Sequence, residues 1–237
     1  MVLATREAEQ LTRDLANMAY IDFLSTLHTA TKRDYLARMT EHPKADAIKR
    51  AKPYGYDYWD GDRKFGFGGY RYDGRWRKVA DALVKHYGLK AGDKVLDVGC
   101  GKGFLLYDLM QAVPGLDVRG IDISEYAIAN AKEEVKPFLQ VANAVALPFA
   151  DKSFDLVISL NTLHNLYCDE LDKALREVER VGRRDKYIVM ESYRTEEEKV
   201  NMMCWVLTGE CFFTPKEWEW WFKLTGYTGD HAFIYFE

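Results

Sequence analysis

Residues 94–105 read Lys94-Val95-Leu96-Asp97-Val98-Gly99-Cys100-Gly101-Lys102-Gly103-Phe104-Leu105. A β-branched, apolar run ends at an acid and three alternating glycines, and apolar residues then recur at helical spacing, which predicts a strand, a tight turn and a helix. Glycine suits such a turn because the backbone bends sharply and lets a ligand approach where a Cβ would collide with it. We therefore expect a nucleotide-binding turn here.

The spacing of the glycines distinguishes between nucleotide ligands. Dinucleotide-binding turns carry G-x-G-x-x-G, in which the third glycine lets the helix pack close to the strand, and here Phe104 stands at that position. Asp97, two residues before Gly99, suits a cationic or hydrogen-donating ligand better than a phosphate. No G-K-[ST] follows, which excludes a Walker loop. The pattern points to S-adenosylmethionine.

Two stretches of the chain resemble one protein family. Val95 to Gly103 is similar to motif I of the class I S-adenosylmethionine-dependent methyltransferases, V-L-D-x-G-x-G-x-G, and Leu147 to Asp155 is similar to the family's A-L-P-F-x-D-x-S-F-D. The resemblance runs from Arg75 to about Met190. It implies an α/β fold with a doubly wound, mostly parallel, seven-stranded sheet whose C-terminal strands are shortened. This domain would span residues 75–237 and follow an N-terminal helical and aromatic, glycine-rich extension, residues 1–74.

The donor site that the resemblance implies lies at the ends of strands. Asp122 follows Gly101 by 21 residues, close to the spacing of about 20 that places a strand-end acid on ribose hydroxyls. Family members often carry Asp at the position of Asn143 to hold the adenine amino group, and the Asn amide oxygen can accept the same hydrogen bond. The residues expected to contact S-adenosylmethionine are Asp97, Gly99, Cys100, Gly101, Gly103, Asp122, Ile123, Asn143, Ala144 and Asn161.

Composition limits the other functions of the chain. Its 237 residues suffice for a sizeable core. The net charge of −4 and the lack of a long basic run disfavour a general role in binding nucleic acids. The four cysteines show no metal-site spacing, so we expect reduced thiols in the cytoplasm and no metal. A charged start and short apolar runs predict neither a signal peptide nor a membrane span.

The first 52 residues are expected to form helices. Leu11, Leu15 and Met18 recur on one face; Leu24 with Leu27, and Leu36 with Met39, follow it. His42-Pro43 interrupts the pattern. Two interpretations stay open. In one, the helices cover the mouth of the active site. In the other, they only pack against the rest of the chain or form a homodimer.

Residues 54–76 are unusually rich in both glycine and aromatic residues. Glycine at this density disfavours regular structure, and exposed rings at this density would be an unexplained apolar surface. A loop that folds over a ligand would explain both observations. The alternative is that the rings fill a small separate core. The residues expected to bind the acceptor substrate are Tyr70, Tyr72, Arg75 and His164.

The remaining elements alternate in βα order. Helices are expected over 79–87, before Gly88; over 171–181, before Gly182; from Thr195; and from Thr214-Pro215, which carries a capping sequence. Strands are expected at 116–121, 138–141, 156–160 and 186–190, with short closing strands at 227–229 and 232–236.

Three residues are candidates for the general base that an oxygen or nitrogen acceptor needs. His164 comes first because it follows a strand and because histidine has a suitable ordinary pKa; Glu191 and Tyr193 come next. No motif of nucleic-acid methyltransferases is present, so we expect a small polar acceptor: a sugar, nucleotide-sugar, amino acid or secondary metabolite. Two alternatives are a partner subunit that binds the donor without transferring methyl, and a nicotinamide-dependent oxidoreductase, which Phe104 disfavours.

Overall fold

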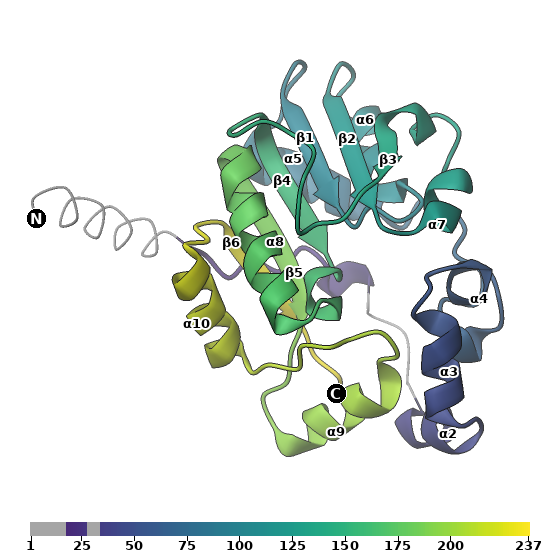
Figure 1. The fold of residues 1–237 in the computed structure, drawn as a ribbon. Helices are drawn as coiled ribbons and strands as arrows, with labels where there is room; N and C mark the ends of the chain where they lie inside the picture. The colour runs from purple at the N-terminus through teal and green to yellow at the C-terminus, as the bar shows by residue number, and fades with distance from the viewer. Residues whose placement is uncertain (1–17, 28–33) are drawn as a thin grey trace, which may run out of the picture.

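The computed structural model describes residues 18–27 and 34–237. In these residues the centre of the fold is a sheet of six strands in the order β3-β2-β1-β4-β5-β6, with parallel pairing throughout (Figure 1). The strands are β1 (Lys94–Val98), β2 (Asp117–Asp122), β3 (Leu139–Val141), β4 (Phe154–Leu160), β5 (Gly182–Glu191) and β6 (Asp230–Ile234).

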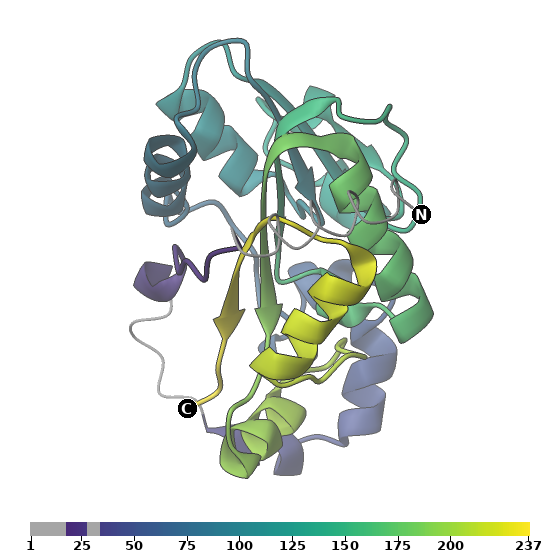
Figure 2. The ribbon, with the colours of Figure 1, turned by 90° about the vertical axis from the view of Figure 1, so that its left-hand side faces the viewer.

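Helices cover both faces of this sheet, because alternate residues of each buried strand point to opposite sides. Val95 packs with α5 (Arg77–Tyr87) and α6 (Phe104–Ala112) on one face. Leu96 packs with α8 (Cys168–Val181) and α10 (Pro215–Thr225) on the other. Figure 2 shows the sheet edge-on, with a layer of helices on each side of it. The doubly wound, class I methyltransferase-like α/β fold is therefore confirmed.

The C-terminal part of the sheet differs from the expectation. Within residues 34–237 there are six strands rather than seven, and β6 pairs in parallel with β5. Residues 227–229 form no strand. After α10, Gly226 takes a left-handed conformation (φ 72°), and the buried Tyr227 hydroxyl donates to the Asp230 carbonyl at 2.8 Å, which turns the chain directly into β6.

The free edge of β6 is covered by residues 18–27. The Ile21 amide donates to the His231 carbonyl at 2.9 Å and the His231 amide donates to the Ala19 carbonyl at 3.0 Å. Covering an edge in this way protects unpaired backbone groups from pairing with other chains. The helix expected around Leu24 and Leu27 is only the short η1 (Ser25–Leu27), whereas Leu11 and Leu15 lie outside the described residues.

Short helices gather at the carboxyl ends of the strands, in the lower part of Figure 1. They are α2 (Tyr35–Thr40), α3 (Lys44–Ala51), α4 (Tyr56–Trp59), η2 (Arg63–Phe65) and α9 (Glu196–Trp205); the connections also contain α7 (Glu125–Ala129), η3 (Lys136–Phe138) and η4 (Leu163–Asn165). The break at His42-Pro43 is confirmed. The buried face expected on α2 is wrong, since Leu36 is 70% and Met39 41% exposed.

Candidate functional site

One cavity of about 540 Å³ lies at the carboxyl edge of the sheet. Its walls come from the ends of the strands, from residues 54–76 and from α2 and the end of α9. Parallel strands bring these ends to one edge, which is where open α/β sheets bind ligands. The volume is in the usual range for sites of small molecules.

The three glycines after β1 have different neighbours. A Cβ on Gly99 (φ 85°) would lie 2.1 Å from Thr162 Oγ1, so glycine allows the turn to approach the loop after β4. A Cβ on Gly101 would lie 2.8 Å from the Trp59 ring. Gly103 does not line the cavity: a Cβ there would meet Val135 at 2.7 Å. Glycine at position 103 therefore allows the turn to pack closely against Val135 and Leu139.

Two buried acids stand beside this turn. Burial, and secondarily the charge of Asp122, raises the pKa of Asp97 to about 7. One Asp122 oxygen accepts the Gly101 amide and the other accepts the Ser124 amide, both at 2.8 Å. A carboxylate has about four acceptor sites, so each oxygen retains capacity for a ligand hydroxyl. Burial also raises the pKa of Asp122.

The remaining residues expected to contact the donor line the same cavity: Cys100, Ile123, Asn143, Ala144 and Asn161. Asn143 Oδ1 accepts the Val145 amide at 3.1 Å, which orients its side chain. Burial raises the pKa of the Cys100 thiol, which keeps it neutral. Every donor residue inferred from the sequence except Gly103 therefore meets in one place.

Residues 54–76 are fastened over the glycine turn. The buried Lys102 ammonium donates to both Asp60 oxygens, at 2.8 and 2.7 Å, and to the Tyr70 carbonyl at 2.9 Å. The Trp59 indole donates to Ser124 Oγ at 2.9 Å. Sequence reasoning missed Lys102, whose only signal is its place between two glycines of a ligand turn.

The residues expected to bind the acceptor separate in the structure. Tyr70, Arg75 and His164 line the cavity, whereas Tyr72 does not; its hydroxyl donates to Asp108 at 2.6 Å. Arg75 forms a bidentate ion pair with Asp73. The rings of Trp59 and Phe67 also line the cavity, while Phe65 packs in a small separate cluster with Ala47, Ala51 and Leu207.

The buried His164 and the partly buried Glu191 lie together at the wall of the cavity. Burial lowers the pKa of His164 to about 3, so its ring is neutral at pH 7. Its Nδ1 accepts the Glu191 amide at 3.5 Å, which places the proton on Nε2, 3.3 Å from Glu191 Oε2. The histidine of ordinary pKa that we expected is thus not observed. Tyr193 is buried in the core and does not line the cavity.

Several other residues of the cavity carried no sequence signal. Thr162 comes from the loop after β4, Arg38 from α2 and Trp205 from the end of α9, whereas Arg63, from η2, lies within the residues 54–76 that the sequence singled out. These segments are far apart in sequence and belong to no motif, so only the fold brings them to the site.

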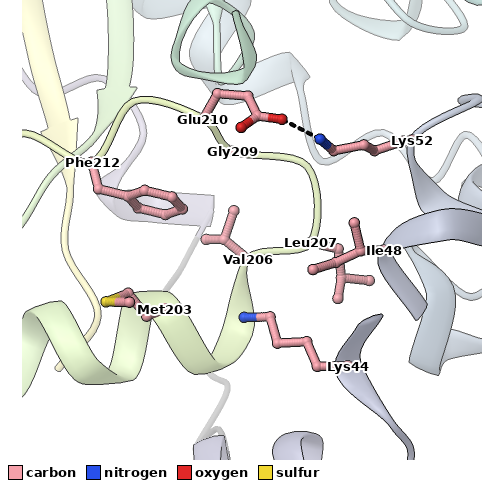
Figure 3. Close-up of a pocket in the computed structure, with 9 residues that line it drawn as sticks. All are labelled: Lys44, Ile48, Lys52, Met203, Val206, Leu207, Gly209, Glu210 and Phe212. Atoms are coloured by element: carbon pink, nitrogen blue, oxygen red, sulfur yellow. Dashed lines mark hydrogen bonds and ion pairs between the residues drawn. The ribbon is translucent and has the colours of Figure 1, made fainter. Parts of the chain in front are cut away.

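A second, smaller cavity of about 210 Å³ lies between α3 and the chain that follows α9 (Figure 3). Lys44 and Lys52 stand on its α3 side, and Lys52 pairs with Glu210. Its floor is apolar, with Ile48 and Val206 among the contributors.

Two negative findings apply to residues 18–27 and 34–237 alone. No cluster of three or more His, Cys, Asp or Glu side chains there has the arrangement of a metal site. None of the helices in these ranges has the length and apolar character needed to cross a bilayer.

Comparison with known proteins provides independent evidence on the family of this chain. The family model described as a methyltransferase domain matches residues 89–226. An uncharacterized protein of Methanocaldococcus jannaschii is 40% identical over 48% of this chain and 42% of its own length. Demethylmenaquinone methyltransferase of Symbiobacterium thermophilum is 35% identical over 46% of this chain and 45% of its own length. The chain thus matches less than half the length of these relatives.

Solved structures show the same fold. Phosphoethanolamine N-methyltransferase 2 of Haemonchus contortus, in complex with phosphomonomethylethanolamine and S-adenosylhomocysteine, superposes with a TM-score of 0.54 at 23% identity, over 83% of this chain and 45% of that one. The YcgJ protein of Bacillus subtilis gives a TM-score of 0.51 at 21% identity, over 62% of this chain and 66% of that one.

Proposed function

This chain belongs to the class I methyltransferase family, and from that premise we propose that it transfers the methyl group of S-adenosylmethionine to a small polar acceptor. The acceptor classes are those named above: a sugar, nucleotide-sugar, amino acid or secondary metabolite. One observation carries the proposal: the glycine turn with Asp97 and Asp122 opens into the same cavity as the His164–Glu191 pair.

The residues at the β1, β2 and β3 ends fit the donor. The glycine turn allows close backbone approach, Asp122 retains acceptor capacity for ribose hydroxyls, and Asn143 offers an oxygen to an adenine amine. When bound, S-adenosylmethionine supplies an electrophilic methyl group. The strand order then leaves the β4, β5 and β6 ends of the cavity for the acceptor.

We further propose that Glu191, rather than His164, takes the acceptor's proton. The neutral His164 ring uses Nδ1 to accept the Glu191 amide, and its protonated Nε2 lies 3.3 Å from the Glu191 carboxylate. Such a ring has no free lone pair for a substrate proton. His164 is therefore a positioning residue that orients a carboxylate at the cavity wall.

Calorimetric titration with S-adenosylhomocysteine tests the donor site. The wild-type chain should bind it, and Asp122→Ala should weaken binding by about 1–3 kcal/mol because a buried acceptor is lost. Unchanged affinity in that variant would contradict the ribose assignment. Tight binding of NADH in place of S-adenosylhomocysteine would favour the oxidoreductase alternative.

Steady-state kinetics with an acceptor found by screening tests the proton acceptor. Glu191→Gln should lower kcat by roughly 10²–10⁴-fold with donor affinity retained. His164→Asn, which keeps a donor near Glu191, should lose less than His164→Ala. A His164→Ala variant with normal kcat would contradict the positioning role of the ring. A wild-type chain that binds S-adenosylhomocysteine tightly but methylates none of the acceptors tested would support the partner-subunit alternative. The homodimer stays a prediction, to be tested by sedimentation.

A further inference from the structure

Of the three described arginines that line the cavity, Arg38 and Arg63 lie beside Trp205, whereas Arg75 is paired with Asp73. Trp205, which lines the cavity, packs edge-on against Tyr35, and Tyr35 packs against Phe236, just beyond β6. In the strand order β6 is the far edge from β3. Arg38 and Arg63 reach the cavity beside Trp205, whereas the buried acids Asp97 and Asp122 stand at the β1 and β2 ends.

Arg38 is held in a fixed position. Its Nε donates to the Trp205 carbonyl at 3.0 Å and its Nη1 donates to the Arg63 carbonyl at 3.0 Å. Its guanidinium lies over the Trp205 ring, 4.5 Å from the centroid, and the Arg63 guanidinium lies 5.3 Å from the same centroid. A guanidinium has five N–H donors, so these two bonds leave three of the Arg38 donors for a ligand.

The electrostatics of this pair favour an added anion. Burial, and secondarily the neighbouring charge of Arg63, lowers the pKa of Arg38 to about 10. No carboxylate of residues 18–27 or 34–237 forms an ion pair with Arg38. Two like charges on one aromatic ring repel each other, and an anion between them would relieve that repulsion.

We propose that Arg38 and Arg63 form a subsite for an anionic group of the acceptor, a phosphate monoester or a carboxylate. This deepens the proposed function and rests on it: the acceptor presents its nucleophile near Glu191 and its anion at the β6 end of the same cavity. A planar guanidinium binds either group through two parallel hydrogen bonds. The acids near the donor turn repel the same anion, so the acceptor's orientation is set at both ends.

Calorimetry with defined probes tests the subsite. Ethyl phosphate, propionate and the neutral 1-propanol are titrated into the chain with and without saturating S-adenosylhomocysteine. Wild type should bind at least one anion and bind 1-propanol far more weakly. Arg38→Gln should weaken anion binding by roughly tenfold or more, because charge-assisted hydrogen bonds are lost. Arg38→Lys should retain part of it.

The controls separate this inference from the proposed function. Arg176→Gln, on the exposed side of α8 and paired with Asp172, should leave anion affinity unchanged. Arg63→Gln tests the same subsite from an exposed position if Arg38→Gln fails to fold. Equal anion affinity in wild type and both arginine variants, or no anion binding, would overturn the subsite while S-adenosylhomocysteine still binds. Anion binding through Arg38 without any S-adenosylhomocysteine binding would overturn the proposed function instead.

Discussion

Asp97 shows how a single residue couples folding to ligand binding. Its side chain is only 4% exposed, and its pKa is raised to about 7, whereas an unfolded aspartate titrates near 3.9. The folded chain therefore binds this proton more tightly than the unfolded chain does. The contribution of protonated Asp97 to the free energy of unfolding is therefore complete below a pH of about 4. It decreases as the pH rises and is lost above a pH of about 7.

Asp97→Asn should consequently melt at a higher temperature than wild type at pH of about 8 and close to wild type at pH of about 4. The charged carboxylate is also the better acceptor for hydrogen-donating groups, so wild-type affinity for S-adenosylhomocysteine should rise between pH of about 6 and 8. In Asp97→Asn that rise should be absent. Calorimetry and thermal melts across this range measure both; identical pH profiles for the two proteins would show that Asp97 does not face the donor.

At the scale of an element, residues 54–76 are held to the donor turn by few polar contacts. Lys102 and the Tyr126 hydroxyl, at 2.8 Å, both bind Asp60, and the Trp59 indole binds Ser124. The Tyr72 hydroxyl donates to Asp108, and the stacked rings of Tyr70 and Phe104, with centroids 5.0 Å apart, add an aromatic contact. We propose that this segment is a lid, since closing over the ligands would exclude water before methyl transfer.

Asp60→Asn should loosen this segment because it leaves the buried Lys102 ammonium without its carboxylate. Limited proteolysis should then cut within residues 54–76 faster than in wild type, and S-adenosylhomocysteine with acceptor should slow cleavage of the wild-type chain. Asp62→Asn is the matched control, since Asp62 is exposed, caps η2 and pairs only with Lys64 of its own segment among the described residues. Cleavage rates that are equal with and without ligands would refute the lid.

At the scale of the whole molecule, the outer edge of the sheet depends on contacts between distant parts of the chain. The Tyr187 hydroxyl, from β5, donates to the Ile21 carbonyl at 2.8 Å and accepts the Phe23 amide at 3.4 Å. The rings of Tyr187 and Phe23 pack edge-on with centroids 5.0 Å apart. This hydroxyl therefore helps to hold residues 18–27 over β6.

Tyr187→Phe should lower the free energy of unfolding by about 0.5–1.5 kcal/mol, the usual value of one such hydrogen bond. Amide exchange at Ile21 and His231 should accelerate, because their backbone bonds depend on this attachment. Tyr107→Phe, on α6, is the comparison, since its ring contact with Lys132 is kept. Denaturant unfolding and hydrogen exchange provide the measurements, and unchanged exchange at both amides would contradict the role given to the hydroxyl.

Local patterns in the chain were enough to predict most of the sheet and most of the residues that meet in the cavity at the β1, β2 and β3 ends. The strand, turn and helix at residues 94–105, the capped helix at Thr214 and the strand-end acid Asp122 are each specified within a few residues, because periodicity and turn chemistry act at short range. The same local logic overstated one feature, the closing strand at 227–229, where a buried tyrosine turns the chain.

The part of the cavity that we propose for the acceptor depended on the tertiary structure. Arg38, Arg63 and Trp205 belong to three separate helical segments, and no periodicity relates them; they meet only because the segments fold over one edge of the sheet. The pKa of His164 is likewise a property of its surroundings, because burial lowers it to about 3. Sequence carries the local chemistry of each residue, whereas burial and the proximity of distant side chains arise from packing of the whole chain.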